Sequence, residues 1–259
     1  MDKKSINRAA RTIELKANSK KEFFLVHGYT GSPTDFNKLG HYLHKRFNAN
    51  VKIMRIVGHG TKIEDLDSLH YKDFLECVEK ELRKDLKKGR KIIIGGLCLG
   101  SLIAFELASH YPVKGIFSSS ASYKYRFPVN ILSYLEPAIL KKHWKKPATA
   151  YEKRARMGSY NYPYVHLRGI KIIRQAKKSL KNKWKNVQAP CVMIHCNWDR
   201  ILHNRSDEEI IKRIGSKKVK KFLFESDSEG EHNLFFSPYH KKVYKIFGDF
   251  FEENKVFEK

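Results

Sequence analysis

The segment KIIIGGLCLGSLIAFELA, residues 91–108, decides the fold of this chain. A short apolar run meets two glycines, a cysteine follows, and a pattern with helical spacing begins directly after it. This order predicts a buried strand, a sharp turn and a helix. Cys98 would then lie at the turn, between Gly96 and Gly100.

A side chain at such a turn is well placed to act as a nucleophile. The turn exposes it, small neighbours on both sides let strand and helix approach, and the helix start supplies free N–H groups and positive potential. A thiol there would be acidified by the helix end and by a nearby histidine, and the thiolate is the reactive form. The pattern therefore predicts Cys98 as a nucleophile, with a small buried cysteine beside a packing turn as the structural alternative.

Strand-like and helix-like segments alternate over most of the chain. Short apolar runs are followed by segments with helical periodicity, such as residues 71–86 and 99–110. The alternation predicts an α/β fold with a doubly wound, mostly parallel sheet. Residues 11–16 are expected to add an outer strand. The other predicted strands are residues 22–26, 51–56, 91–96, 113–120, 190–196 and 218–226, and the last helix is residues 238–253.

Residues 123–186 interrupt this alternation, since they contain no clear strand pattern. We expect them to form an inserted helical cap, or lid, on a core made of residues 1–122 and 187–259. The insertion holds 17 lysines and arginines, two acidic residues and ten aromatic residues. Its aromatic side chains would line an acyl pocket while its lysines face solvent, or the segment would contact nucleic acid or an anionic membrane.

Composition sets the broad class. The chain has 259 residues, of which 41% are apolar, so it can bury a substantial core. The net charge of +25 either attracts anionic partners or serves solubility alone. No apolar run reaches the roughly 18 residues of a membrane helix, and the first 16 residues lack the apolar stretch of a secretory signal. Four cysteines are too few for a disulfide framework, so we expect reduced thiols and a cytoplasmic location.

A nucleophile of this kind needs a base and an acid that orients the base, and they follow it in the order acid, then histidine. Asp199 lies in the loop after strand 190–196, and His232 lies in the loop before the last helix. Both loops are at the carboxyl edge of the predicted sheet. His232 would take the proton of the nucleophile, and Asp199 would hold the imidazole in one tautomer. Three nearby acids are less well placed for that role, namely Asp207, Asp227 and Glu231.

Acyl transfer also needs two N–H donors for the developing oxyanion. One would be the backbone N–H of Leu99, directly after the nucleophile. The other would be the backbone N–H of Tyr29, in the loop HGYTG after the first core strand, where glycines let the chain pass close to the substrate. We expect the side chains of His27 and His59 to brace loops rather than take part in catalysis.

The ordered motifs resemble the α/β-hydrolase superfamily, and more narrowly bacterial carboxylesterases and lysophospholipases of the monoacylglycerol-lipase type. They are LVHGYTGSPTDFNKLGHYL, IVGHG, GGLCLGSLIAFELA, APCVMIHCNWDRIL and the late His232, and they cover residues 20–254 apart from the insertion. The resemblance implies an eight-stranded type of sheet, a cap between its sixth and seventh strands, and neither cofactor nor metal. Carried over, the catalytic residues are Cys98, Asp199 and His232, and the oxyanion donors are Tyr29 and Leu99.

The chain departs from the family pattern at two positions. Serine usually occupies the nucleophile turn, where this chain has Cys98, although cysteine stands there in dienelactone hydrolases and polyhydroxyalkanoate synthases. The usual Gly-His pair is replaced by Glu231-His232: either the carboxylate raises the basicity of the histidine, or the loop simply differs from that of the family.

These observations predict an acyl hydrolase that cleaves carboxylic esters. A thioesterase or acyltransferase that uses the cysteine is the second interpretation. The third is a non-catalytic hydrolase scaffold that binds anionic partners through its basic cap. The expected partner is a small-molecule ester or thioester, with an anionic lipid surface as a further contact of the cap. Nucleic acid is not expected, and the sequence makes no prediction of the oligomeric state.

Overall fold

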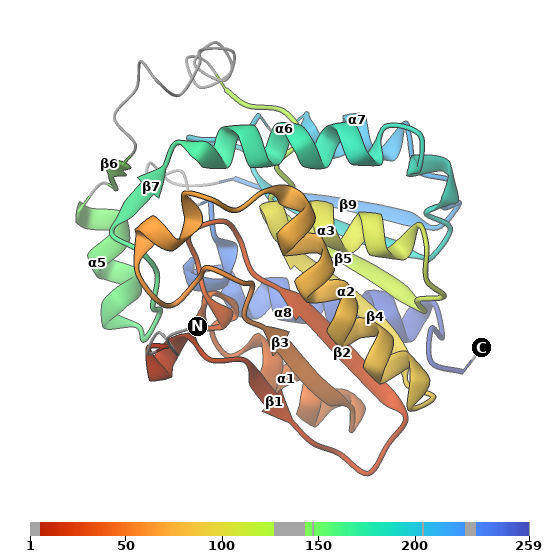
Figure 1. The fold of residues 1–259 in the computed structure, drawn as a ribbon. Helices are drawn as coiled ribbons and strands as arrows, with labels where there is room; N and C mark the ends of the chain where they lie inside the picture. The colour runs from red at the N-terminus through yellow and green to blue at the C-terminus, as the bar shows by residue number, and fades with distance from the viewer. Residues whose placement is uncertain (1–5, 127–142, 147, 204, 226–231, 259) are drawn as a thin grey trace.

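The computed structural model describes residues 6–126, 143–146, 148–203, 205–225 and 232–258 (Figure 1). The chain forms a seven-stranded sheet covered by helices on both faces. The strand order is β1-β3-β2-β4-β5-β8-β9. The strands are β1 (Ile13–Leu15), β2 (Lys21–Val26), β3 (Asn50–Met54), β4 (Lys91–Leu97), β5 (Gly115–Ser119), β8 (Cys191–Cys196) and β9 (Val219–Phe224).

The sheet confirms the predicted fold class. Every neighbouring pair is parallel except β1 with β3, which is antiparallel, so the segment at residues 11–16 does add an outer strand. The predicted strand bounds are wrong by one or two residues at several ends. Residue type does not mark the point at which the hydrogen-bonded ladder stops, so strand ends are less certain than strand centres.

Helices cover the two faces of the sheet because each buried strand is apolar on both sides. On β2, Phe23 and Leu25 point into one core cluster and Phe24 and Val26 into the other. Figure 1 shows α2, α3 and α6 on the near face and α1 and α8 on the far face. The helices are α1 (Leu39–Phe47), α2 (Tyr71–Lys87), α3 (Leu99–Ala108), α5 (Ala148–Arg156), α6 (Arg168–Leu180), α7 (Ser206–Ile211) and α8 (His240–Glu253).

Single helical turns complete the described elements. They lie in connections, and two of them, η2 and η5, stand close to the predicted site loops. These turns are η1 (Arg8–Ala10), η2 (Pro33–Phe36), η3 (Ile63–Leu66), η4 (Trp184–Asn186) and η5 (Leu234–Phe236). Phe36 closes η2, and α1 begins three residues later, at Leu39.

The predicted insertion contains α5, α6 and η4, and also a two-stranded antiparallel sheet made of β6 (His143–Lys145) and β7 (Tyr164–His166). The prediction that this segment lacks a strand was wrong, since three-residue strands are too short to give a periodic signal. Helix α6 packs on α2 and α3 and contributes Ile172 and Leu180 to the core. The domain limits at residues 122 and 187 stay a prediction.

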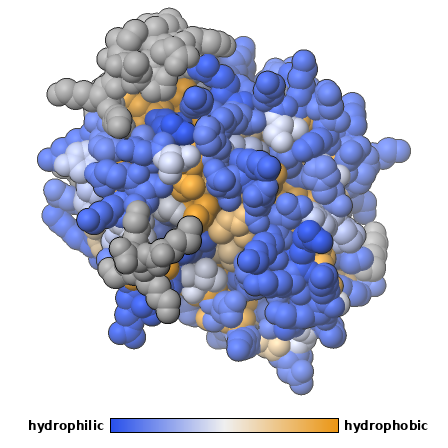
Figure 2. Space-filling view, in the orientation of Figure 1, coloured by the Kyte–Doolittle hydropathy of each residue, from blue (hydrophilic) through white to orange (hydrophobic). Residues whose placement is uncertain are grey.

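The hydrophilic surface and the free cysteines are those that the composition predicts. Figure 2 shows a face that is mostly hydrophilic, with hydrophobic side chains gathered near its centre. Within the described part of the chain, helices are too short or too polar to cross a membrane. All four cysteines are free, and Cys191 and Cys196 point to opposite sides of the sheet.

The turn between β4 and α3 depends on two glycines. A Cβ at Gly96 would overlap the backbone of Gly100, and a Cβ at Gly100 would overlap the backbone carbonyl of Val26. The start of α3 thus lies directly against the ends of β2 and β4. Because the obstacles are backbone atoms, no side-chain rotation can relieve such an overlap.

We predict that Gly100→Ala lowers the free energy of unfolding by more than about 2 kcal/mol, because the start of α3 must move away from β2. Urea denaturation followed by circular dichroism measures this change. Gly40→Ala in α1 is the matched control, since its added Cβ meets only side-chain carbons, of which the nearest are Ile53 Cδ1 at 3.1 Å and Val51 Cγ1 at 3.4 Å. Equal stability of the two variants would contradict the packing argument.

Candidate active site

Cys98 occupies the turn between β4 and α3 with a strained backbone. Its φ is 57° and its ψ is −114°, a conformation that non-glycine residues rarely adopt. The Cys98 N–H donates to the carbonyl of Ser119 at 2.9 Å, which ties the turn to β5. The prediction of a sharp strand-to-helix turn is confirmed, and the thiol is only partly buried.

The thiol of Cys98 has three polar neighbours. Its Sγ lies 2.7 Å from the Oγ of Ser122, and the His232 imidazole and the Leu99 N–H also interact with it. Burial alone would raise the pKa of Cys98, but the His232 imidazole, the Ser122 hydroxyl and the Leu99 N–H together hold it below its ordinary value. The surroundings therefore favour the thiolate.

His232 and Asp199 meet as the sequence predicts. The Nδ1 of His232 lies 2.7 Å from the Oδ2 of Asp199, across a separation of 33 residues. Burial would lower the pKa of His232, but the negative charges of Asp199 and of the Cys98 thiolate raise it well above its ordinary value. Since Nδ1 faces Asp199, Nε2 is the nitrogen left for Cys98. Cys98, His232 and Asp199 are thus brought into one constellation.

Asp199 is fully buried, and its carboxylate is held from several sides. Its Oδ1 accepts the backbone N–H groups of Ile201 at 2.8 Å and Leu202 at 3.0 Å. Burial would raise the pKa of Asp199, but His232 and His195 keep it well below its usual range. The carboxylate is therefore charged at neutral pH.

A second histidine supports Asp199, and the sequence analysis missed it. His195 on β8 is fully buried between two carboxylates, with its Nε2 3.5 Å from Asp199 and its Nδ1 3.5 Å from Asp207. Burial would lower the pKa of His195, but Asp199 and Asp207 raise it to about 9. Asp207, named above as a competing acid, therefore lies against His195. The other two competitors, Asp227 and Glu231, lie outside the described residues, so the effect expected of the Glu231 carboxylate on His232 stays a prediction.

The loop after β2 approaches Cys98 closely. A Cβ built on Gly28 would lie 3.2 Å from the Cβ of Cys98. The loop is braced by the two predicted histidines: the Ile56 N–H donates to the Nε2 of His27 at 3.1 Å, and the Thr30 N–H donates to the Nε2 of His59 at 3.1 Å. Tyr29 thus sits in a fixed loop beside the thiol, and the oxyanion roles of Tyr29 and Leu99 stay predictions.

Two buried tyrosine hydroxyls, of which that of Tyr125 lies near the thiol, were not predicted. The Oη atoms of Tyr29 and Tyr125 are buried and have no hydrogen-bond partner among the described residues. Burial raises the pKa of Tyr125 well above its ordinary value, and the nearby Cys98 thiolate raises it further. Tyr125 belongs to the aromatic-rich insertion, whereas Tyr29 lies in the loop HGYTG, where only its backbone N–H was assigned a role.

The insertion also brings a lysine toward the site. Lys146 donates from Nζ to the Oδ1 of Asn161 at 3.2 Å. Burial and the charge of Arg154 lower the pKa of Lys146 to about 7, against the opposing charges of Asp35 and Cys98. The expectation that the lysines of the insertion face solvent is therefore wrong for Lys146. On α6 the exposed cations are Lys171, Arg174 and Lys178, and their contact with anionic lipid stays a prediction.

A separate group of side chains has metal-ligand chemistry. Asp67, His143 and His166 place one ligand atom each within 4.8 Å of one another. None of them belongs to the constellation of Cys98, and they are considered below.

Two curated proteins are similar to this chain. A thermostable monoacylglycerol lipase from Bacillus sp. (strain H-257) is 31% identical over 88 residues, so the match spans 34% of this chain and only 35% of that lipase. A carboxylesterase from Bacillus subtilis (strain 168) is 22% identical over 199 residues, which are 75% of this chain and 78% of that esterase. Both relatives are named as enzymes that hydrolyse carboxylic esters.

Solved structures share the fold. A structure from the work on LipS and LipT, two metagenome-derived lipolytic enzymes, superposes with a TM-score of 0.81 at 16% identity, covering 96% of this chain and 100% of that one. A family model described as "Serine aminopeptidase, S33" (Hydrolase_4) matches residues 17–238, which is most of the chain. The protein therefore belongs to this family of the α/β-hydrolase superfamily.

Proposed function

We propose that the chain is a carboxylic ester hydrolase in which Cys98 is the nucleophile, His232 the base and Asp199 the residue that orients the base. The main support for this proposal is a thiol on a strained turn, beside an imidazole whose Nδ1 lies 2.7 Å from a fully buried carboxylate. The lowered pKa of Cys98 and the raised pKa of His232 support a thiolate–imidazolium pair as the resting state.

The proposed reaction has two stages. The Cys98 thiolate attacks the acyl carbon, and the carbonyl oxygen becomes an oxyanion held by the N–H groups of Tyr29 and Leu99. As the tetrahedral intermediate collapses, the C–O bond breaks and His232 gives its Nε2 proton to the departing alcohol. The acyl group is left on Sγ as a thioester. His232 then takes a proton from water, the hydroxide attacks the thioester carbon, and the carboxylic acid leaves as the thiolate is restored.

A thiol in place of the usual serine favours a second function, thioester hydrolysis or acyl transfer. Thioesters resemble the proposed intermediate, so exchange of an acyl group between a substrate thiol and Cys98 is nearly balanced in energy. Comparing kcat/KM for butyryl-CoA with that for p-nitrophenyl butyrate separates the two functions. A larger value for the simple ester would count against the second function.

We predict that Cys98→Ala lowers kcat/KM for p-nitrophenyl butyrate by at least about 10³-fold, because the covalent intermediate can no longer form. Intact-protein mass after brief mixing should show a butyryl adduct on the parent chain and none on the Ala variant. Cys77→Ala is the matched control, since Cys77 lies on α2 and does not belong to the constellation of Cys98, His232 and Asp199. Full activity of Cys98→Ala would refute the assignment, and a parent that forms neither adduct nor product would favour a scaffold that binds without catalysis.

We predict that iodoacetamide alkylates Cys98 with a midpoint below about pH 8.5, the ordinary value for a cysteine thiol. His232→Ala should move this midpoint upward, because the imidazole cation is the main group that lowers the pKa of Cys98. Peptide mass mapping against pH measures the midpoint. The pKa of Cys77 is raised by burial, so Cys77 serves as an internal reference. An unchanged midpoint in His232→Ala would mean that the thiol and the imidazole are not coupled.

The Tyr125 hydroxyl is buried and has no hydrogen-bond partner among the described residues. It could therefore bond to a substrate whose alcohol part carries a free hydroxyl, such as a monoacylglycerol. We predict that Tyr125→Phe lowers kcat/KM for a monoacylglycerol by about 3- to 10-fold, the value of one hydrogen bond, and leaves p-nitrophenyl butyrate unaffected. Tyr111→Phe is the control, because that hydroxyl bonds to Glu79, on α2. Equal losses for both substrates would show that the hydroxyl supports the fold of the site instead.

A further inference from the structure

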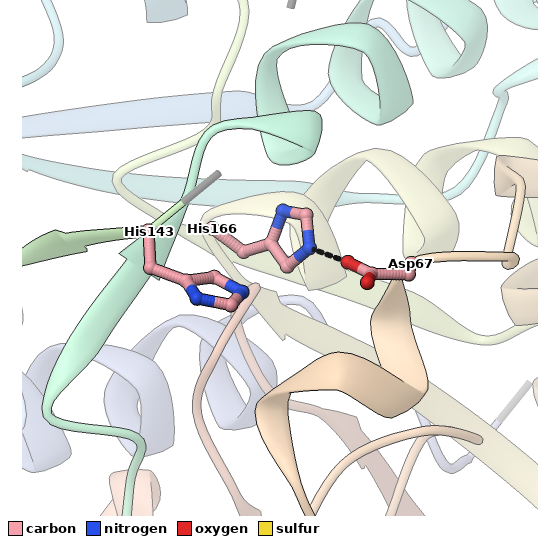
Figure 3. A group of neighbouring side chains, drawn as sticks. All are labelled: Asp67, His143 and His166. Atoms are coloured by element: carbon pink, nitrogen blue, oxygen red, sulfur yellow. Dashed lines mark hydrogen bonds and ion pairs between the residues drawn. The ribbon is translucent and has the colours of Figure 1, made fainter. Parts of the chain in front are cut away.

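Three side chains at the junction of the insertion and the core converge on one point (Figure 3). Asp67 follows η3 of the core, while His143 and His166 lie on β6 and β7 of the insertion. One ligand atom from each residue lies within 4.8 Å of the other two. Imidazole nitrogen and carboxylate oxygen together are the ligands that zinc binds in three-ligand protein sites.

The pairing of β6 with β7 explains why the two histidines meet. His143 is directly opposite His166 in the antiparallel register, so both side chains leave the same face of the pair. Their ring centroids are 4.9 Å apart, and the rings are nearly perpendicular at 77°. Figure 3 shows one ring nitrogen of His143 directed toward His166 and Asp67.

A buried nitrogen of His143 gives independent support for a bound ligand. Its Nε2 is buried and has no hydrogen-bond partner among the described residues. An unsatisfied buried polar atom costs about 1–3 kcal/mol, and such atoms call for an explanation in native structures. A metal ion between the rings and Asp67 would use this lone pair.

His166 is already oriented for the role. Its Nε2 lies 2.5 Å from the Oδ1 of Asp67, and its Nδ1 accepts the N–H of Arg168 at 3.1 Å. A metal on Nε2 moves the ring proton to Nδ1, so the Arg168 N–H must find another acceptor. That N–H is in the first turn of α6, where water commonly satisfies helix N–H groups. The rearrangement is therefore local.

We propose that Asp67, His143 and His166 form a site for a divalent transition-metal ion of the zinc type, which links the β6–β7 pair to the core. Bonds of about 2.0–2.2 Å require the three ligand atoms to draw closer, and water would complete a four-coordinate ion. Because the ligands come from both parts of the chain, the ion would fix the insertion against η3.

The test is zinc titration of the full-length protein, dialysed against chelator, by isothermal calorimetry. It is run on the parent and in a Cys98→Ala background, so that zinc held by the Cys98 thiol is not counted. We expect one ion per chain in the Cys98→Ala protein, and a rise in its thermal midpoint with zinc. Cobalt in place of zinc should give the visible absorption of a four-coordinate site.

His143→Gln and Asp67→Asn should each weaken zinc binding by more than about 100-fold and abolish the thermal shift. His41→Gln, at an exposed histidine on α1, is the matched control and should bind as the Cys98→Ala protein does. The thermal midpoints without metal reveal any variant that fails to fold. The proposal would be overturned if the Cys98→Ala protein bound no zinc at 100-fold excess. It would also be overturned if His143→Gln and Asp67→Asn bound zinc as tightly as the Cys98→Ala protein.

Discussion

The close approach of α3 to the ends of β2 and β4 is the constraint on which the rest of the site depends. It forces Cys98 into a positive φ, a conformation that costs about 1–3 kcal/mol and persists only where the surrounding structure fixes it. Here the Ser119 carbonyl accepts both the Cys98 N–H, at 2.9 Å, and the Ser101 hydroxyl, at 3.2 Å. The strained backbone thus makes the thiol project from the sheet edge toward loops that follow other strands.

A row of alternating charges extends from that thiol into the core. It runs from Cys98 to His232, Asp199, His195 and Asp207, and each carboxylate or thiolate is next to an imidazole. The alternation explains how Asp199 is charged although it is fully buried. The His195 cation also makes Asp199 less basic, so the proton shared with His232 stays on the imidazole. The second imidazole therefore strengthens the orienting role proposed for Asp199.

The mostly parallel sheet and the meeting of the three predicted side chains were predictable because they follow from backbone rules. Parallel strands deliver their carboxyl ends to one edge, so residues just after β4, β8 and β9 must meet there. His195 escaped prediction because it lies inside an apolar strand, where a histidine usually indicates packing. His143 and His166 are 23 residues apart and meet only through the short β6–β7 pair, for which periodicity gives no signal.

The lysines of the insertion differ in their surroundings: Lys171 and Lys178 on α6 are exposed, whereas Lys146 is half-buried. A lysine that is buried as a cation without a partner costs several kcal/mol. The pKa of Lys146, about 7, lets a large fraction of it become neutral near physiological pH, which removes that cost when an acyl chain displaces water. The negative charges of Asp35 and of the Cys98 thiolate oppose this lowering of the pKa and favour the cation. Burial and these two negative charges therefore act on Lys146 in opposite directions, and its pKa lies near neutral pH as a result.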